Sequence, residues 1–333
     1  MPYCRKCGAQ LSDDARFCHV CGTPVTSPVA GDPRTAPLCQ PVRKATFPLA
    51  AIILIAIMIF SVVAAVVVLL PFQPVEFNQQ NEASAANVNS LHLNLEADIA
   101  DINVNFRDLP GNQRVIVNVS ATGWRGIFAS DQPVTLAFKE ESEGATLTYT
   151  GTILRVETWP SLYSLDVKCD VYVDPAANLN LSVRTSSGRI VMSADQNATF
   201  QGINLETTAG SVELFWNDAE VAGDIQVNLK TTAGGIVINV AQKRELSGNV
   251  TLNAETTAGG IVSAVNVRDN VGAKIEAITS FGETNVRQQG FSGNQSPLQS
   301  SNYPAGSNFI INLETGAGGI DIDADYGPTG VRS

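Results

Sequence analysis

Four cysteines near the N-terminus carry the clearest chemistry in the sequence. They form two Cys-x-x-Cys-Gly pairs, Cys4 with Cys7 and Cys18 with Cys21, separated by ten residues. The glycine after each pair permits a left-handed backbone, so amide groups can point toward the sulfur atoms. Two such pairs facing each other make a closed tetrahedral site of four thiolates, the geometry of structural zinc. The sequence therefore predicts one structural Zn²⁺ bound by Cys4, Cys7, Cys18 and Cys21, with no open coordination position for catalysis.

Two other assignments of these cysteines stay open at this point. They could form two disulfides if the segment lies in an oxidising compartment. Iron could also replace zinc, because a site of four thiolates accepts both metals. His19 lies between two of the cysteines, and we predict that it is a surface residue and not a ligand. A segment this short has no core of its own, so a metal is expected to fold it.

The two cysteine pairs also carry a family resemblance. Residues 3–24 resemble the short zinc-ribbon domain found at the N-terminus of many prokaryotic membrane proteins. The resemblance covers under a tenth of the chain and implies a structural zinc site.

A proline-rich segment and a long apolar segment follow. The six prolines between Gly22 and Pro48 predict an extended linker over residues 26–46. Cys39 lies in this linker as an unmodified or lipidated thiol. The next segment, from Leu49 to Leu70, contains no charged residue. At 1.5 Å per residue it would span roughly 33 Å, and we predict a single transmembrane helix within residues 47–71.

The charges that flank this apolar segment predict its orientation. Arg43 and Lys44 precede it, whereas no Lys or Arg follows it until Arg107. By the positive-inside rule the zinc ribbon, residues 1–25, would lie in the cytoplasm and residues 72–333 would be extracellular. The predicted localisation is therefore the cell membrane, in a single-pass protein.

The remainder of the chain contains a repeated motif, a threonine followed by a glycine-containing turn and a hydrophobic residue. The recurring threonines are Thr185, Thr207, Thr231, Thr256, Thr279 and Thr315, at steps of 22, 24, 25, 23 and 36 residues. Apolar residues alternate before each turn, as in Ile225, Val227 and Leu229, which predicts strands with one buried face. The glycines would supply positive φ at the corners, and the threonine hydroxyls would bond along the stack.

This pattern predicts an all-β fold for the large C-terminal part. We expect a parallel β-solenoid with coils of about 22–25 residues over residues 89–326, preceded by an extracellular linker over residues 72–88. In the longest step, residues 288–307 are rich in Gln, Ser, Gly and Asn and are expected to form a loop extruded from one coil. Residues 90–325 resemble the putative-adhesin β-solenoid domain family of bacterial and archaeal surface proteins, and no functional residues come with that resemblance.

Few residues in this part of the chain could act in catalysis. His92 is its single histidine and is predicted to face solvent, so the sequence offers no good Ser-His-Asp or Cys-His arrangement. Cys169 is predicted to be a small core residue. Asp321, Asp323 and Asp325 share one strand face and could bind Ca²⁺, or they could form a solvated acidic edge on the last coil. We therefore predict no enzymatic activity and no catalytic residues.

Charge limits the class of partner. Residues 71–333 contain fifteen Lys and Arg against twenty-nine Asp and Glu, which excludes the basic footprint that nucleic acid requires. The sequence thus favours a membrane-anchored surface protein whose non-catalytic solenoid binds a protein or glycan outside or supports the envelope. The alternative is an envelope-sensing signalling protein whose zinc ribbon binds a cytosolic protein.

Overall fold

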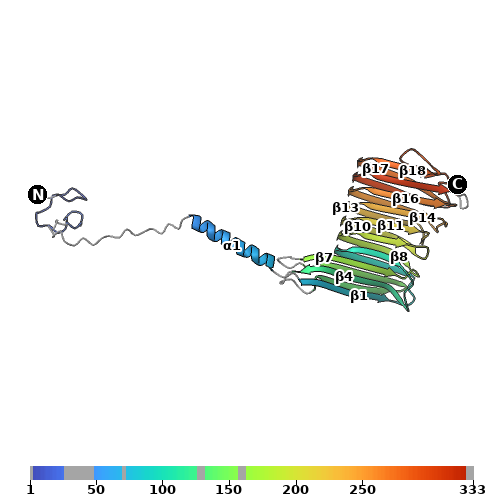
Figure 1. The fold of residues 1–333 in the computed structure, drawn as a ribbon, viewed down its shortest axis with the longest axis horizontal. Helices are drawn as coiled ribbons and strands as arrows, with labels where there is room; N and C mark the ends of the chain where they lie inside the picture. Colours follow the sequence, from blue (N-terminus) through green and yellow to red (C-terminus); the bar gives the residue numbers. More distant parts are fainter. Residues whose placement is uncertain (1–2, 26–48, 70–72, 126–131, 157–162, 328–333) are drawn as a thin grey trace. The chain divides into compact units, whose positions relative to one another are not determined.

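The computed structural model describes residues 3–25, 49–69, 73–125, 132–156 and 163–327. The chain divides into two compact units, Met1–Val67 and Val68–Ser333. The second unit is a stack of β-strands, drawn from cyan to red in Figure 1. The predicted proline-rich linker, including Cys39, lies outside the described residues.

One helix, α1 (Leu49–Leu69), lies in the apolar segment. Its described side chains, those of residues 52–63, are exposed. Within the described part of the chain, no helix is both long enough and apolar enough to cross a membrane. This finding corrects the predicted single transmembrane helix over Leu49–Leu70.

The strands of the second unit form two sheets. The first sheet has ten strands, which in spatial order are β1 (Gln73–Ser84), β4 (Gln113–Arg125), β7 (Tyr163–Val173), β3 (Asp101–Phe106), β9 (Ile190–Ala194), β11 (Val212–Asn217), β14 (Ile236–Gln242), β16 (Ile261–Arg268), β22 (Ile320–Gly327) and β18 (Thr284–Gln289).

The second sheet has eleven strands in one path and a short twelfth beside it. In spatial order they are β19 (Phe291–Ser292), β20 (Leu298–Ser300), β17 (Val271–Phe281), β21 (Ser307–Ala317), β15 (Val250–Ala258), β13 (Ile225–Ala233), β10 (Thr199–Ala209), β8 (Asn178–Ser187), β2 (Ser90–Ile99), β6 (Thr146–Arg155) and β5 (Val134–Glu143), while β12 (Glu220–Val221) pairs with β10. Inward-facing residues of both sheets form one hydrophobic core.

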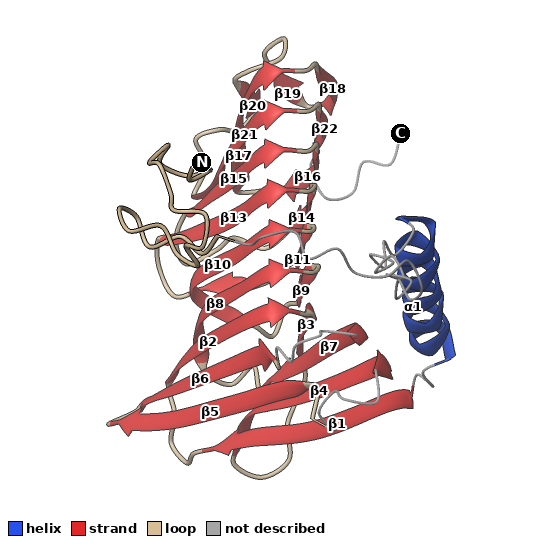
Figure 2. Cartoon of the chain, turned by 90° about the vertical axis from the view of Figure 1, so that its left-hand side faces the viewer, coloured by secondary structure: helices blue, strands red, loops and turns tan. Residues whose placement is uncertain are grey.

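Strands from the two sheets alternate along the chain in the central part of this stack (Figure 2). Neighbouring coils pair in parallel and in register, so that Thr207 lies beside Thr231 and Thr231 beside Thr256. The Thr231 hydroxyl donates to the Gly210 carbonyl of the preceding coil at 2.9 Å, and the Thr256 hydroxyl donates to the Gly234 carbonyl at 3.0 Å. The predicted bonding of threonine hydroxyls along the stack is confirmed at these corners.

The corner glycines are also confirmed as positive-φ positions in close contact. Gly234 has φ 153°. A Cβ on Gly234 would lie 1.8 Å from the Gly210 carbonyl oxygen, and one on Gly259 would lie 1.9 Å from that of Gly234. No side chain fits at such a distance, which explains why the repeat requires glycine here.

The predicted architecture is nevertheless wrong for the unit as a whole, because both sheets are mixed and do not make a uniform parallel solenoid. The antiparallel pairs are β1–β4, β4–β7, β5–β6, β17–β20 and β19–β20. The connection between β5 and β6 shows one physical reason. Only Gly144 and Ala145 separate these strands, and such a short loop can join strands only in antiparallel order.

The order of the last coils also differs from the sequence order. β21 lies between β15 and β17, and β22 lies between β16 and β18. The coil that ends the chain is therefore inserted into the stack, and the coil of β17 and β18 lies beyond it. The segment 288–307, which we expected to be a loop, contains the short strands β19 and β20 and leads back into this inserted coil.

Candidate metal centre

Two tight turns present the four N-terminal cysteines. In the first turn the Gly8 amide donates to the Cys4 carbonyl, and in the second the Gly22 amide donates to the Cys18 carbonyl, both at 2.9 Å. Gly8 and Gly22 have φ of 74° and 68°, which is the left-handed conformation predicted for the residue after each pair. Isolated bridges from Tyr3 to Gln10 and from Phe17 to Pro24 close the two hairpins.

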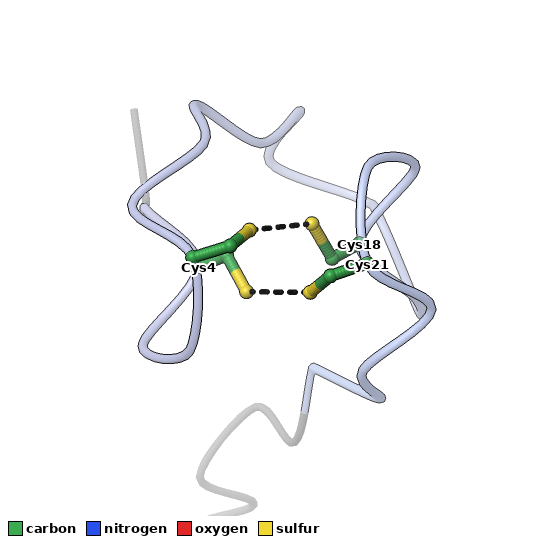
Figure 3. A group of neighbouring side chains, drawn as sticks. Cys4, Cys18 and Cys21 are labelled. Carbon is green, nitrogen blue, oxygen red and sulfur yellow. Dashed lines mark hydrogen bonds between the residues drawn. The ribbon is translucent and has the colours of Figure 1, made fainter.

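The four sulfur atoms converge on one point (Figure 3). All four Sγ atoms lie within 4.8 Å of one another. The Sγ atoms of Cys4 and Cys21 are 3.6 Å apart, as are those of Cys7 and Cys18. In a tetrahedron with Zn–S bonds of about 2.3 Å, the sulfur atoms would be about 3.8 Å apart. The cluster is therefore compatible with structural zinc binding, and the cysteines are free and not joined as disulfides.

Burial around the cluster is uneven. Cys4 and Cys18 are buried and form a small core with Leu11. Cys21 is half-buried and Cys7 is exposed, as is His19. A core of three residues is too small to stabilise a fold by itself, so a bound metal would supply the missing stabilisation.

The polar surroundings of the thiols differ from one cysteine to the next. Backbone amides of Lys6 and Cys7 lower the pKa of Cys4. The hydroxyl of Thr23, 3.2 Å from the Cys21 sulfur, and the Thr23 amide lower the pKa of Cys21 to about 6. The pKa of Cys7 is raised to about 12, because the neighbouring thiols and desolvation together outweigh the amide of Ala9, which lowers it. Four adjacent thiols cannot all ionise without a cation, and a divalent metal would provide the missing positive charge.

Thr23 contributes to this site and was not among the residues predicted from the sequence. Its position two residues after the last cysteine, directly after Gly22, places its hydroxyl beside the sulfur. In the sequence, a residue with a hydroxyl or amide donor directly after the glycine of a Cys-x-x-Cys-Gly turn is the signal for such a contact with the cysteine sulfur.

His92, Cys169 and the three aspartates of β22 belong to the second unit, and among its described residues no group of three or more side chains is arranged to hold a metal. Cys169 is fully buried, and burial raises its pKa to about 12, as expected for a core residue. His92 is half-buried on β2.

Asp321, Asp323 and Asp325 lie on β22, which is flanked by β16 and β18. The expectation of an acidic edge on the last coil is therefore wrong. The Asn285 amide donates to Asp321 at 3.0 Å, and Arg268 pairs with Asp325 at 2.6 Å.

Comparison with known proteins agrees with this geometry at the N-terminus. Residues 3–25 match the family model of a zinc-ribbon domain. The zinc ribbon and its four cysteines thus fit a structural zinc cofactor. No curated protein matches the chain at a significant level.

Several solved structures are similar to the chain over its larger part. A putative cell adhesion protein from Clostridium sporogenes ATCC 15579 has 15% identity and a TM-score of 0.45, with 75% of this chain and 99% of that chain covered. A putative adhesin from Bacteroides fragilis NCTC 9343 has 10% identity and a TM-score of 0.26, with 74% and 97% covered. A putative adhesin from Parabacteroides merdae ATCC 43184 has 10% identity and a TM-score of 0.21, with 74% and 95% covered.

Proposed function

We propose that the second unit, Val68–Ser333, called the two-sheet unit below, is a non-catalytic binding module for adhesion that is displayed at the cell surface. We also propose that the zinc ribbon is a structural module. In this proposal Cys4, Cys7, Cys18 and Cys21 are the zinc ligands, and the partner of the sheets is a protein or glycan. The observation that carries the proposal is the set of outward-facing side chains that the stacked coils hold in fixed register.

Rows of bonded side chains cross the second sheet on its outer face. The Asn253 amide donates to the Asn228 side-chain oxygen at 3.0 Å, and the Asn312 amide donates to Asn253 at 2.9 Å. In a parallel row, Arg184 pairs with Glu206 at 2.6 Å and Lys230 with Glu255 at 3.0 Å. Side chains that are already ordered lose little entropy when a partner binds, so such faces suit recognition.

The interior supports these faces rigidly. The rings of Phe200 and Trp216 pack at 5.4 Å between centroids, and those of Trp216 and Phe309 at 5.7 Å. The Trp216 indole donates to the buried Gln242 side chain at 2.9 Å. A packed core of this kind keeps the outer rows in place.

The chemistry of the described side chains supports a binding role over catalysis. Cys169 is buried with a raised pKa, so its thiol is neither ionised nor accessible at neutral pH. His92 lies among strand residues of β2, beside Thr148 and Asn180, with no nucleophilic thiol or carboxylate among these register partners.

An adhesion assay tests the proposal. Beads coated with the full chain should be retained on surfaces covered with intact bacterial cells or with mucin, and soluble full chain should compete for this retention. Retention no greater than that of albumin-coated beads would refute the adhesion function. Labelling of intact producing cells with an antibody against the two-sheet unit tests surface display separately.

A further inference from the structure

The outer face of the first sheet contains a hollow, and its lining includes Asp323 and Asp325 of the acidic row on β22. It has a volume of about 520 Å³, within the range of ligand-binding pockets. It crosses the neighbouring strands β14, β16, β22 and β18. Strands spaced about 4.8 Å apart make this hollow about 14 Å long, which is long enough for an extended ligand.

The hollow exists because short side chains lie between long ones. In one register row Ala264 lies between Asn239 and Asp323, and Arg287 follows Asp323. In the next row Ala241 precedes Asn266, Asp325 and Gln289. The alanine methyl groups form the floor, and the longer polar side chains form the sides.

The polar groups around the hollow can both donate and accept hydrogen bonds. The side chains of Asn239, Asn266 and Gln289 make no hydrogen bond to another residue that the structure describes. Each amide has two donors and one acceptor oxygen. Hydroxyl groups, which donate and accept at once, are the natural complement of such amides.

The charges around the hollow are balanced. Asp325 pairs with Arg268 at 2.6 Å, and Asp323 lies 4.0 Å from Arg287. Each carboxylate already has a cationic partner, so a divalent metal would have to displace an arginine. With two carboxylates beside two guanidinium groups, the hollow has no excess positive charge to attract a phosphate or sulfate. A neutral ligand fits this charge distribution.

An exposed aromatic ring lies next to one lining residue of the hollow. Phe215 on β11 is the register neighbour of Asn239 and is 37% exposed. A flat apolar ring beside free amides can pack against the C–H face of a sugar ring while the amides bind its hydroxyl groups.

From these observations we infer that the hollow on β14, β16, β22 and β18 binds a neutral oligosaccharide. This inference rests on the proposed function, because it names the ligand class that the binding module would recognise. The Ala264 floor makes room for the sugar, and the Asn239 and Asn266 amides bind its hydroxyl groups.

Direct sugar binding by the full chain tests the inference. The probes are an array of neutral oligosaccharides with sialylated and sulfated counterparts, followed by calorimetric titration of the neutral sugar that binds best. Ala264→Phe, which fills the hollow, should weaken binding at least tenfold. Ala137→Phe is the matched control, because Ala137 is exposed on β5 of the other sheet, and it should bind like the wild type.

A milder variant separates binding from folding. Asn239→Ala removes one exposed amide and should weaken binding several-fold while leaving the thermal unfolding temperature unchanged. The inference is overturned if no neutral sugar binds the wild type, if anionic sugars bind more tightly, or if Ala264→Phe binds as well as Ala137→Phe. The bead assay distinguishes this result from failure of the proposed function. Beads that adhere equally with wild type and Ala264→Phe would leave adhesion intact and exclude the hollow.

Discussion

At the scale of single residues, the proposed zinc site depends on four sulfur atoms. Their separations of 3.6 Å across the two turns match a tetrahedral thiolate site, and His19 is exposed beside them. We expect Cys18→Ser in the full chain to reduce bound zinc from about one ion per chain to almost none, because a closed site needs all four ligands. His19→Ala should retain the metal. Zinc content measured by mass spectrometry checks both variants, and equal zinc loss in the two would show that the ligand set is wrong.

Two adjacent glycines give a second prediction at this scale. Gly234 has a φ of 153°, and a Cβ on it would lie 1.8 Å from the Gly210 carbonyl oxygen. A Cβ on Gly235 would lie 3.4 Å from its nearest neighbour, the Gly260 carbonyl oxygen. The left-handed conformation alone costs a side chain roughly 1–2 kcal/mol, and the clash adds to this. Gly234→Ala should therefore lower the free energy of unfolding by more than about 2 kcal/mol, and Gly235→Ala by less than about 1 kcal/mol. Denaturant unfolding of both variants measures the difference. Equal stabilities would exclude the corner role of Gly234.

At the scale of elements, the coil formed by β17 and β18 is less buried than the neighbouring coil of β21 and β22. Ala277 and Val286 are half-buried there, whereas Leu313 and Ile322, their register partners in the next coil, are buried. Ile278 on β17 is 62% exposed. Local opening costs less free energy where fewer apolar groups are buried.

Hydrogen exchange should therefore be faster in β17 and β18 than in the central strands β13 and β14. Mass spectrometry of peptides from the full chain measures this, and β13 and β14 serve as the internal reference. Uniform protection along the stack would contradict the prediction. It would imply that another part of the chain or a partner covers this coil.

The corners of the coils were predictable from the sequence, and the reason is local. The repeat contains a threonine, a glycine three residues later and a hydrophobic residue two positions after that glycine. These three positions together determine the turn, the φ of its glycine and where the neighbouring strands begin and end. Thr231 and Gly234 occupy the positions expected of them, and so does Ile236. The zinc turns were predictable for the same reason, since Gly8 and Gly22 fix their backbone. Thr23 was missed because its contribution depends on a single hydroxyl contact.

At the scale of the whole molecule, the sequence did not predict the order or direction of the strands. Alternation in β4 and β7 shows which residues face the core, but the same alternation fits parallel and antiparallel partners. Similarly, the repeat in β21 fixes its register with β15 without showing that it lies between β15 and β17. Strand order depends on the energies of competing neighbours, which no single repeat contains.

The separation into two units leads to the last prediction. The zinc ribbon has its own small core of Cys4, Leu11 and Cys18, and the sheets have a separate continuous core. If zinc stabilises only the ribbon, its removal should affect only the ribbon, because a ligand stabilises the part of the protein that binds it.

We expect a strong chelator to abolish the protection of residues 3–25 against proteolysis in the full chain. The sheets should keep their far-ultraviolet circular dichroism, and their unfolding temperature should change by less than about 2 °C, the shift that about 1 kcal/mol would cause in a unit of this size. Limited proteolysis and thermal scans of the same samples, with zinc added back as the control, measure both effects. A large fall in the unfolding temperature of the sheets that zinc restores would show that the two units stabilise each other.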